Sequence, residues 1–203
     1  MSHVFPVHGA FRTLWASEKE AYLAHLKRLS MTDRRLRFHC AQGDEALARH
    51  VDTVFERDVH IIGWFVGGVL RGACEVALED LGVTAPQAEA AFTVESRFRG
   101  RGIGHELMHR AILYARNHGA EMLHIDTEAG NQPMLKLANA HGLSLERSQS
   151  DVAGVLRPAP ATVSSRCLEV AEEEVGLITW ALAAFRRLLG RWSERAFRVR
   201  LSH

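Results

Sequence analysis

A glycine-rich turn, Arg99-Gly100-Arg101-Gly102-Ile103-Gly104, constrains the fold of this 203-residue chain more than any other segment. An apolar segment typical of a strand (89–95) precedes the turn, and a segment with helical periodicity (104–117) follows it. Glycines allow a tight turn close to a ligand, and a helix begins with unpaired N–H groups and the positive end of its dipole. The turn therefore suits a pyrophosphate or another anion, with Arg99 and Arg101 adding positive charge.

Two common nucleotide-binding patterns do not fit this turn. A G-x-G-x-x-G pattern that starts at Gly100 requires a glycine where the chain has His105. A P-loop requires the sequence G-K-[ST], which the turn lacks. A solvated turn that only connects a strand to a helix therefore stays open as the alternative to an anion site.

The rest of the chain predicts a mixed α/β (α+β) fold. Periodicity and turn residues predict strands at 11–15, 60–66, 69–78, 89–95, 122–126, 143–148 and 152–156, and helices at 17–29, 44–57, 104–117 and 131–140. The first helix begins at a capping box, Ser17-Glu18-Lys19-Glu20, and Gly67-Gly68 indicates a hairpin. This order predicts a sheet that changes strand direction rather than a repeating βαβ array.

Three neighbouring motifs carry a family resemblance. The stretch R-x-x-G-x-G (Arg99, Gly102, Gly104) resembles the acyl-CoA pyrophosphate-binding motif of the GNAT superfamily of N-acetyltransferases. The strand Ala88–Val94 resembles the central strand of that family. The motif Asn131-x-x-Met134-Leu135-x-Leu137-Ala138 is similar to the second CoA-contacting unit, in the version of bacterial protein-lysine acetyltransferase domains. The resemblance covers residues 11–157, and we assign a GNAT-like domain to residues 1–158.

The resemblance implies a mostly antiparallel mixed sheet with splayed central strands, flanked by helices, and acetyl-CoA as cosubstrate in a cleft between strands 89–95 and 122–126. It implies that the pantetheine arm pairs with the strand backbone and that the turn amides hold the pyrophosphate. The expected CoA-binding residues are Phe92, Thr93, Val94, Arg99, Gly100, Arg101, Gly102, Ile103, Gly104 and Asn131. An amine would attack the thioester directly, without a metal.

The expected catalytic base is Glu89, since a protonated amine must lose a proton before it attacks. The resemblance places a carboxylate at this point of the central strand. The other candidates are Glu75, Glu95, Asp126 and Glu128. Many family members have a tyrosine as general acid where this chain has Ala138, so either water or the product ammonium protonates the thiolate here, or catalysis is weak.

The acceptor amine stays open between a protein lysine or N-terminus and a small molecule. A non-catalytic acyl-CoA-binding regulatory module is the alternative to an enzyme, and the absence of a titratable group at Ala138 favours it. A remoter alternative is a zinc hydrolase, because His105-Glu106-Leu107-Met108-His109 matches H-E-x-x-H. No third ligand is evident in the sequence, and the helix containing this motif begins at the anion-binding turn, so we expect no metal.

The segment 159–203 forms a linker and an amphipathic helical extension beyond the family-like part. Its apolar residues follow a heptad spacing of three and four: Leu168, Ala171, Val175, Ile178, Leu182, Phe185, Leu189 and Trp192. Glutamates gather near the beginning of this segment and arginines near its end. A helix packed on its own domain, a homodimer through this helix, and an arm for a membrane surface or an acidic partner all fit this pattern.

The charge and the cysteine content of the chain limit the classes of partner and metal that we expect it to bind. Lys and Arg number 25 against 24 Asp and Glu, a net charge of +1 that does not favour nucleic acid. The three cysteines have no metal-binding or disulfide spacing. Residues 1–10 lack the pattern of a signal peptide, and no apolar run is long enough to span a membrane, so we expect a cytoplasmic location.

Overall fold

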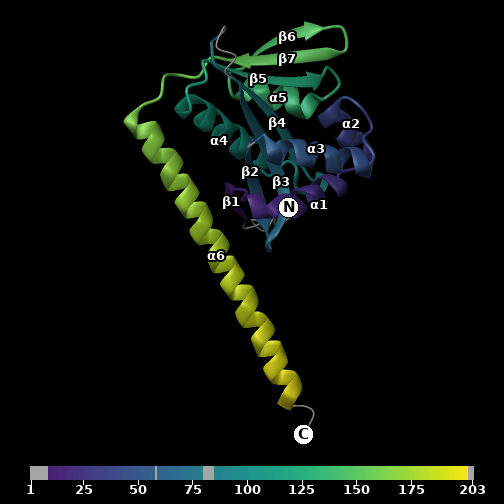
Figure 1. Cartoon of the computed structure of the whole chain (residues 1–203), viewed down its shortest axis with the longest axis vertical. Helices are drawn as coiled ribbons and strands as arrows, with labels where there is room; N and C mark the ends of the chain where they lie inside the picture. Colours follow the sequence, from purple (N-terminus) through teal and green to yellow (C-terminus); the bar gives the residue numbers. More distant parts are fainter. Residues whose placement is uncertain (1–8, 58, 80–84, 201–203) are drawn as a thin grey trace, which may run out of the picture.

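The computed structural model describes residues 9–57, 59–79 and 85–200, with side chains up to Leu189. Within these residues the strands form one seven-stranded sheet of order β1-β2-β3-β4-β5-β7-β6 (Figure 1). The strands are β1 (Ala10–Thr13), β2 (His60–Val66), β3 (Val69–Glu79), β4 (Gln87–Val94), β5 (Met122–Glu128), β6 (Ser144–Ser148) and β7 (Asp151–Leu156). The helices are α1 (Lys19–Lys27), α2 (Met31–Phe38), α3 (Asp44–Glu56), α4 (Ile103–Asn117), α5 (Gln132–Ala140) and α6 (Val163–Arg200).

The centre of the sheet is splayed. Strands β1 to β4 pair antiparallel, and β5, β7 and β6 also pair antiparallel. The two halves are joined by the parallel pair β4–β5, which extends only from Gln87↔Met122 to Glu89↔His124. Beyond this point β4 runs on to Val94 and β5 to Glu128 without pairing to each other. The expected mixed, mostly antiparallel sheet with splayed central strands is therefore confirmed.

Two hydrophobic clusters hold the helices on opposite faces of the sheet. On one face, Ala88 and Ala90 of β4 pack with the buried residues Leu107 and Met108 of α4. On the other face, α1 and α3 cover β2 and β3 through a second cluster, which includes Tyr22, Leu26, Leu47, Val51, Ile61 and Ala73. Alternate residues of β4 therefore face different layers, since side chains alternate across a strand.

The N-terminal third differs from the expectation. Three helices precede β2, where the sequence predicts two; the additional helix is α2. Its N-cap is Ser30, whose hydroxyl accepts a hydrogen bond from the Asp33 amide at 3.1 Å. The predicted capping box at Ser17 is wrong: residues Ala16–Glu18 form a 3-10 turn and α1 begins at Lys19. The Glu18 carboxylate instead binds the buried Arg12 guanidinium through two contacts of 2.6 and 2.7 Å.

The C-terminal segment is one long helix, α6. It runs along β1 and α4 and continues past the rest of the fold at its C-terminal end (Figure 1). The first part of α6 packs on its own domain, which is one of the three arrangements that the sequence leaves open for this segment. None of the helices that the structure describes has both the length and the apolar composition needed to cross a bilayer.

Candidate active site

A cleft of about 470 Å³ lies along the end of β4 that is not paired to β5. Its walls come from the unpaired end of β4 (Phe92, Thr93, Val94), from the glycine turn and from the first turns of α5 (Asn131, Pro133, Met134). Helix α2 closes a further side with Asp33, Leu36 and Arg37. The cleft therefore lies where the sequence places the cosubstrate, with an edge of strand backbone and a helix N-terminus along it.

The glycine turn leaves room for a ligand against its backbone. Gly100 and Gly102 have φ angles of +71° and +83°, a left-handed conformation that disfavours other residues, and a Cβ at either would have no atom within 4 Å. Gly102 is the N-cap of α4, and the first helical hydrogen bond runs from the Glu106 amide to the Gly102 carbonyl. The amides at the beginning of α4 therefore have no carbonyl acceptor within the helix, and they can donate hydrogen bonds to a pyrophosphate group.

The two arginines of the turn have separate surroundings. Arg99 lines the cleft, and its Nε donates to the Val94 carbonyl at 3.0 Å while its Nη2 lies 2.7 Å from Asp33. It thereby ties the end of β4 to α2. Arg101 is exposed, and its guanidinium lies 6.0 Å from the centre of the Phe98 ring. Lys136 of α5 and His105 of α4 are further basic side chains that line the cleft.

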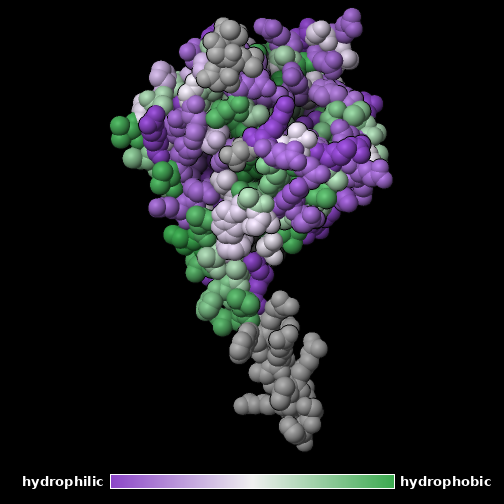
Figure 2. Space-filling view, viewed as in Figure 1, coloured by the Kyte–Doolittle hydropathy of each residue, from purple (hydrophilic) through white to green (hydrophobic). Residues whose placement is uncertain are grey.

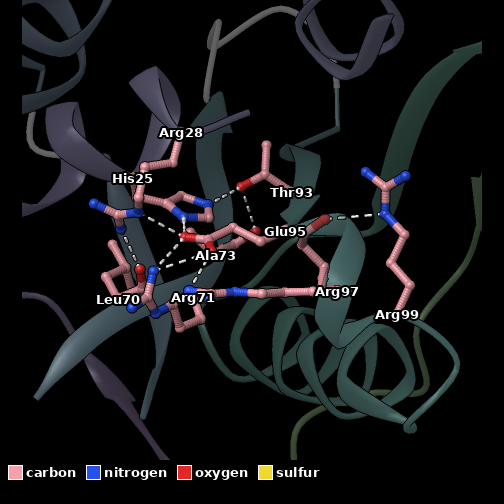
Figure 3. Close-up of polar contacts among 10 residues, drawn as sticks. His25, Arg28, Leu70, Arg71, Ala73, Thr93, Glu95, Arg97 and Arg99 are labelled. Carbon is pink, nitrogen blue, oxygen red and sulfur yellow. Dashed lines mark hydrogen bonds and ion pairs between the residues drawn. The ribbon is translucent and has the colours of Figure 1, made fainter. Parts of the chain in front are cut away.

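A buried carboxylate fixes the end of β4 (Figure 3). Glu95 is 6% exposed and lies 2.7 Å from Arg28 Nε, 3.1 Å from Arg71 Nη1 and 3.3 Å from Arg97 Nη2. Burial alone would raise the pKa of Glu95, but the neighbouring His25 and the arginine charges outweigh it and lower the pKa to about 2. His25 also contacts the Thr93 hydroxyl at 2.9 Å. This network holds in place the strand segment that borders the cleft.

Glu89 lies where β4 and β5 separate, since Glu89↔His124 is their last paired position. Its exposed side chain lines a smaller cavity of about 160 Å³, together with Asp126, Arg37 and His39. This cavity adjoins the cleft, because both are lined by Phe92, Asn131 and Met134. Two exposed carboxylates thus border a small space beside the cleft, together with the Arg37 guanidinium, and the carboxylates can attract a cationic amine.

The other carboxylates have strong ionic partners. Glu75 is buried and contacts Tyr22, Arg37 Nη2 at 2.7 Å and His50 Nε2 at 2.8 Å. Burial alone would raise the pKa of Glu75, but Arg37 and His50 outweigh it and lower the pKa to about 2. Glu128 pairs with Arg35 at 2.7 Å. Glu75 and Glu95 are therefore poor proton acceptors at neutral pH, and Asp126 is the other carboxylate of the small cavity.

The α5 motif shapes the cleft without supplying an acid at Ala138. The Asn131 side chain caps α5 by accepting from the Met134 amide at 3.3 Å, and it donates to the Thr127 hydroxyl at 3.0 Å. Ala138 is fully buried in the hydrophobic cluster with α4. Position 138 thus offers no proton for a leaving thiolate.

The two histidines of the H-E-x-x-H motif have different partners. His105 Nδ1 lies 3.2 Å from His141 Nε2, whereas His109 Nε2 lies 3.1 Å from Glu172 of α6. No group of three or more His, Cys, Asp or Glu side chains among the described residues is arranged to hold a metal ion.

Sequence reasoning missed the contribution of α2 and Lys136 to the cleft. The signal for α2 was present as Ser30 three residues before Asp33, a helix-start pattern. Nothing in the sequence indicates that the guanidinium of Arg37 reaches both Glu75 and the cavity beside Glu89. That arrangement depends on where α2 sits against the sheet.

Known structures share this fold. The GNAT domain of the S. lividans protein PAT is 20% identical, with a TM-score of 0.63 over 72% of this chain and 89% of that one. A putative acetyltransferase from Salmonella typhimurium, solved with acetyl-CoA, is 14% identical (TM-score 0.57; 76% and 96% covered). A ribosomal-protein-alanine N-acetyltransferase from Brucella melitensis is 17% identical (TM-score 0.56; 72% and 98% covered). No curated protein matches the chain significantly.

The family model named acetyltransferase (GNAT) family matches residues 12–143, from β1 to the loop after α5. The matched part contains the splayed strands, the glycine turn and the α5 cap that form the cleft. The chain therefore belongs to the GNAT family of acetyl-CoA-dependent N-acetyltransferases.

Proposed function

We propose that this chain transfers the acetyl group of acetyl-CoA to a primary amine of a protein, a lysine or an N-terminus, with Glu89 as the base. The observation that carries the proposal is the position of Glu89 at the point where β4 and β5 part. The cleft leads from the glycine turn to this point, and the small cavity with Glu89 and Asp126 adjoins it there. A small-molecule amine is the second acceptor class.

The chain's own residues divide into a binding part and a reacting part. The amides of residues 100–104 would hold the pyrophosphate, while the backbone of Phe92, Thr93 and Val94 offers an edge for the pantetheine arm. When bound, acetyl-CoA supplies an activated acyl group as a thioester. Asn131, at the N-terminus of α5, holds the opposite wall in place.

We assign proton movement in the small cavity to Glu89. An alkyl amine is protonated at neutral pH, so a base must take its proton, directly or through one water molecule. The carboxylates of Glu89 and Asp126 would also attract the cationic amine into the cavity. Because Ala138 carries no acid, we propose that water or the product ammonium protonates the thiolate.

A protein acceptor and a cytoplasmic location are parts of the same proposal. The Brucella melitensis neighbour acts, by its name, on a ribosomal protein, and it shares the fold of this chain. The small cavity is bordered by residues of α2, β4 and β5, so an extended chain end or a long lysine side chain would fit its narrow volume of about 160 Å³. Acetyl-CoA and such acceptors meet in the cytoplasm.

The test is a thiol-release assay on lysine peptides, N-terminal peptides and small amines, with mass spectrometry of the products. Glu89→Gln should lower kcat about 100-fold or more and leave the acetyl-CoA Kd unchanged, because general-base catalysis contributes about 10²–10⁴-fold. Glu146→Gln, on the exposed strand β6, is the matched control and should keep full activity. An unchanged rate for Glu89→Gln would assign the base elsewhere, and acetyl-CoA binding without transfer to any amine would favour the regulatory module.

A further inference from the structure

Helix α6 presents two opposite faces, and one of them is fixed to the domain. The Ser165 hydroxyl donates to Asn117 of α4 at 2.5 Å, and Glu173 accepts from the Thr13 amide of β1 at 3.0 Å. A Cβ at Gly176 would lie 1.8 Å from the Phe11 carbonyl oxygen, so helix and strand touch through their backbones there. Trp180 packs edge-on against Trp15, with ring centres 5.3 Å apart.

The opposite face is an apolar seam that the domain leaves uncovered. We define the seam by its heptad positions with described side chains: Leu168, Ala171, Val175, Ile178, Leu182, Phe185 and Leu189. All of its large members are 43–63% exposed, although they are Leu, Val, Ile and Phe. Apolar side chains along α6 are visible in Figure 2. A continuous exposed apolar stripe of this length is unusual on a monomeric protein and marks an interaction surface.

The side chains of the seam match in size when the seam is paired with a second copy of itself that runs in the opposite direction. In two helices that run antiparallel and meet at position 180, Ile178 of one lies level with Leu182 of the other. The next layers then combine Val175 with Phe185, and Ala171 with Leu189. Each outer layer thus sets a small side chain against a large one, which is how a packed core fills space evenly.

The charges of α6 favour the same antiparallel arrangement. Glu169, Glu172, Glu173 and Glu174 lie near its beginning, whereas Arg186, Arg187 and Arg191 lie near its end. In an antiparallel pair, the glutamate-rich beginning of each helix lies beside the arginine-rich end of the other, although Glu169, Glu172 and Glu173 also contact their own domain. A parallel pair in register would instead bring like charges together at both ends and align the two helix dipoles.

We propose that α6 is a dimerisation helix, which pairs with α6 of a second copy of this chain in an antiparallel coiled coil centred near position 180. The fixed face keeps the domain on the far side of the helix from the seam, so two domains would lie on opposite sides of the pair. The cleft lies along the unpaired end of β4, and no seam residue lines it, so each copy would keep its own site.

Light scattering and sedimentation of the full chain test the oligomeric state. The expected mass is twice that of the 22.7 kDa chain. The double variant Ile178→Asp/Leu182→Asp should be monomeric, since it places four carboxylates at the centre of the seam. Val170→Asp is the matched control: Val170 is 58% exposed on the same helix but outside the heptad positions, and this variant should stay dimeric. Circular dichroism checks that each variant is folded.

Thiol cross-linking tests the orientation. Ala171→Cys and Leu189→Cys are made separately in a background where the exposed Cys40 and Cys167 are serine. In the antiparallel pair, the two copies of position 171 lie about 27 Å apart, from 18 residues at about 1.5 Å each. A short cross-linker should therefore not join two copies of the same variant. It should join Ala171→Cys to Leu189→Cys after the two variants are mixed and their subunits have exchanged.

Three results would overturn the proposal. A monomeric wild-type chain at concentrations of tens of micromolar would remove the dimer. A dimer that survives the double aspartate variant would place the interface elsewhere. Cross-linking of Ala171→Cys with itself would show a parallel pair. If the monomeric chain instead binds vesicles of anionic lipid through α6, the seam is a membrane-contacting face.

Discussion

Gly102 at the beginning of α4 and Gly119 just beyond its end form a natural matched pair. Their φ angles are +83° and +86°, and a Cβ at either position would meet no atom within 4 Å. Alanine at each position should therefore cost the fold the same backbone strain, about 1–2 kcal/mol for a left-handed residue. In a chain of this size each 1 kcal/mol lowers Tm by about 2–4 °C. Only Gly102 lines the cleft.

The two variants should therefore separate binding from stability. Gly102→Ala puts a methyl group where the pyrophosphate is proposed to approach the turn, and we expect the loss of at least one charge-assisted hydrogen bond. Such a bond contributes about 1.5–3 kcal/mol, which corresponds to an acetyl-CoA Kd about 10-fold to 150-fold higher. Gly119→Ala should keep the wild-type Kd. Calorimetric titration with acetyl-CoA and thermal unfolding of both variants measure the two effects. Equal Kd values for the two variants would refute the anion-binding role of the turn.

Two further predictions concern stability. The pKa of Glu75 is lowered in the folded chain from 4.5 to about 2, so its stabilising effect is complete above pH 4.5 and is lost as pH falls toward 2. Glu75→Gln leaves Arg37 without its carboxylate partner, so it should lower the urea concentration at the unfolding midpoint at pH 7. It should also make the loss of stability between pH 4.5 and 2 less steep than in the wild type, and an equally steep loss would contradict the assignment. Gly176→Val should lower Tm by at least several degrees and change Trp180 fluorescence, because its Cβ overlaps the Phe11 carbonyl at 1.8 Å. Ala181→Val, on the exposed side of α6, is the control and should change neither Tm nor the fluorescence.

The central part of the fold could be predicted because its signals are local. The glycine turn between a strand and a helix, the Asn131 cap and the apolar runs of β2 and β3 all act through neighbours in sequence. The splayed pair β4–β5 came from the family resemblance, since no local pattern in Gln87–Val94 shows where pairing ends.

The errors lie where distant contacts override local preference. Ser17 and Glu20 fit a capping box by sequence, but α1 begins at Lys19, and the carboxylate of Glu18 binds Arg12 of β1 and the Trp15 amide. In the same way, the heptad pattern of α6 predicts an apolar face without showing that Gly176 and Trp180, on the other face, attach the helix to the domain. The role of Arg99 in joining β4 to α2 also needs the position of Asp33, which only the fold supplies.

Amide hydrogen exchange, with and without acetyl-CoA, tests the location of the proposed cosubstrate site most directly. The account predicts that acetyl-CoA slows exchange at the amides of residues 92–94 and 100–105, which border the cleft, and leaves residues 163–189 of α6 unchanged. Slowed exchange confined to other parts of the chain, or no change at saturating acetyl-CoA, would contradict the cleft along the end of β4 as the cosubstrate site.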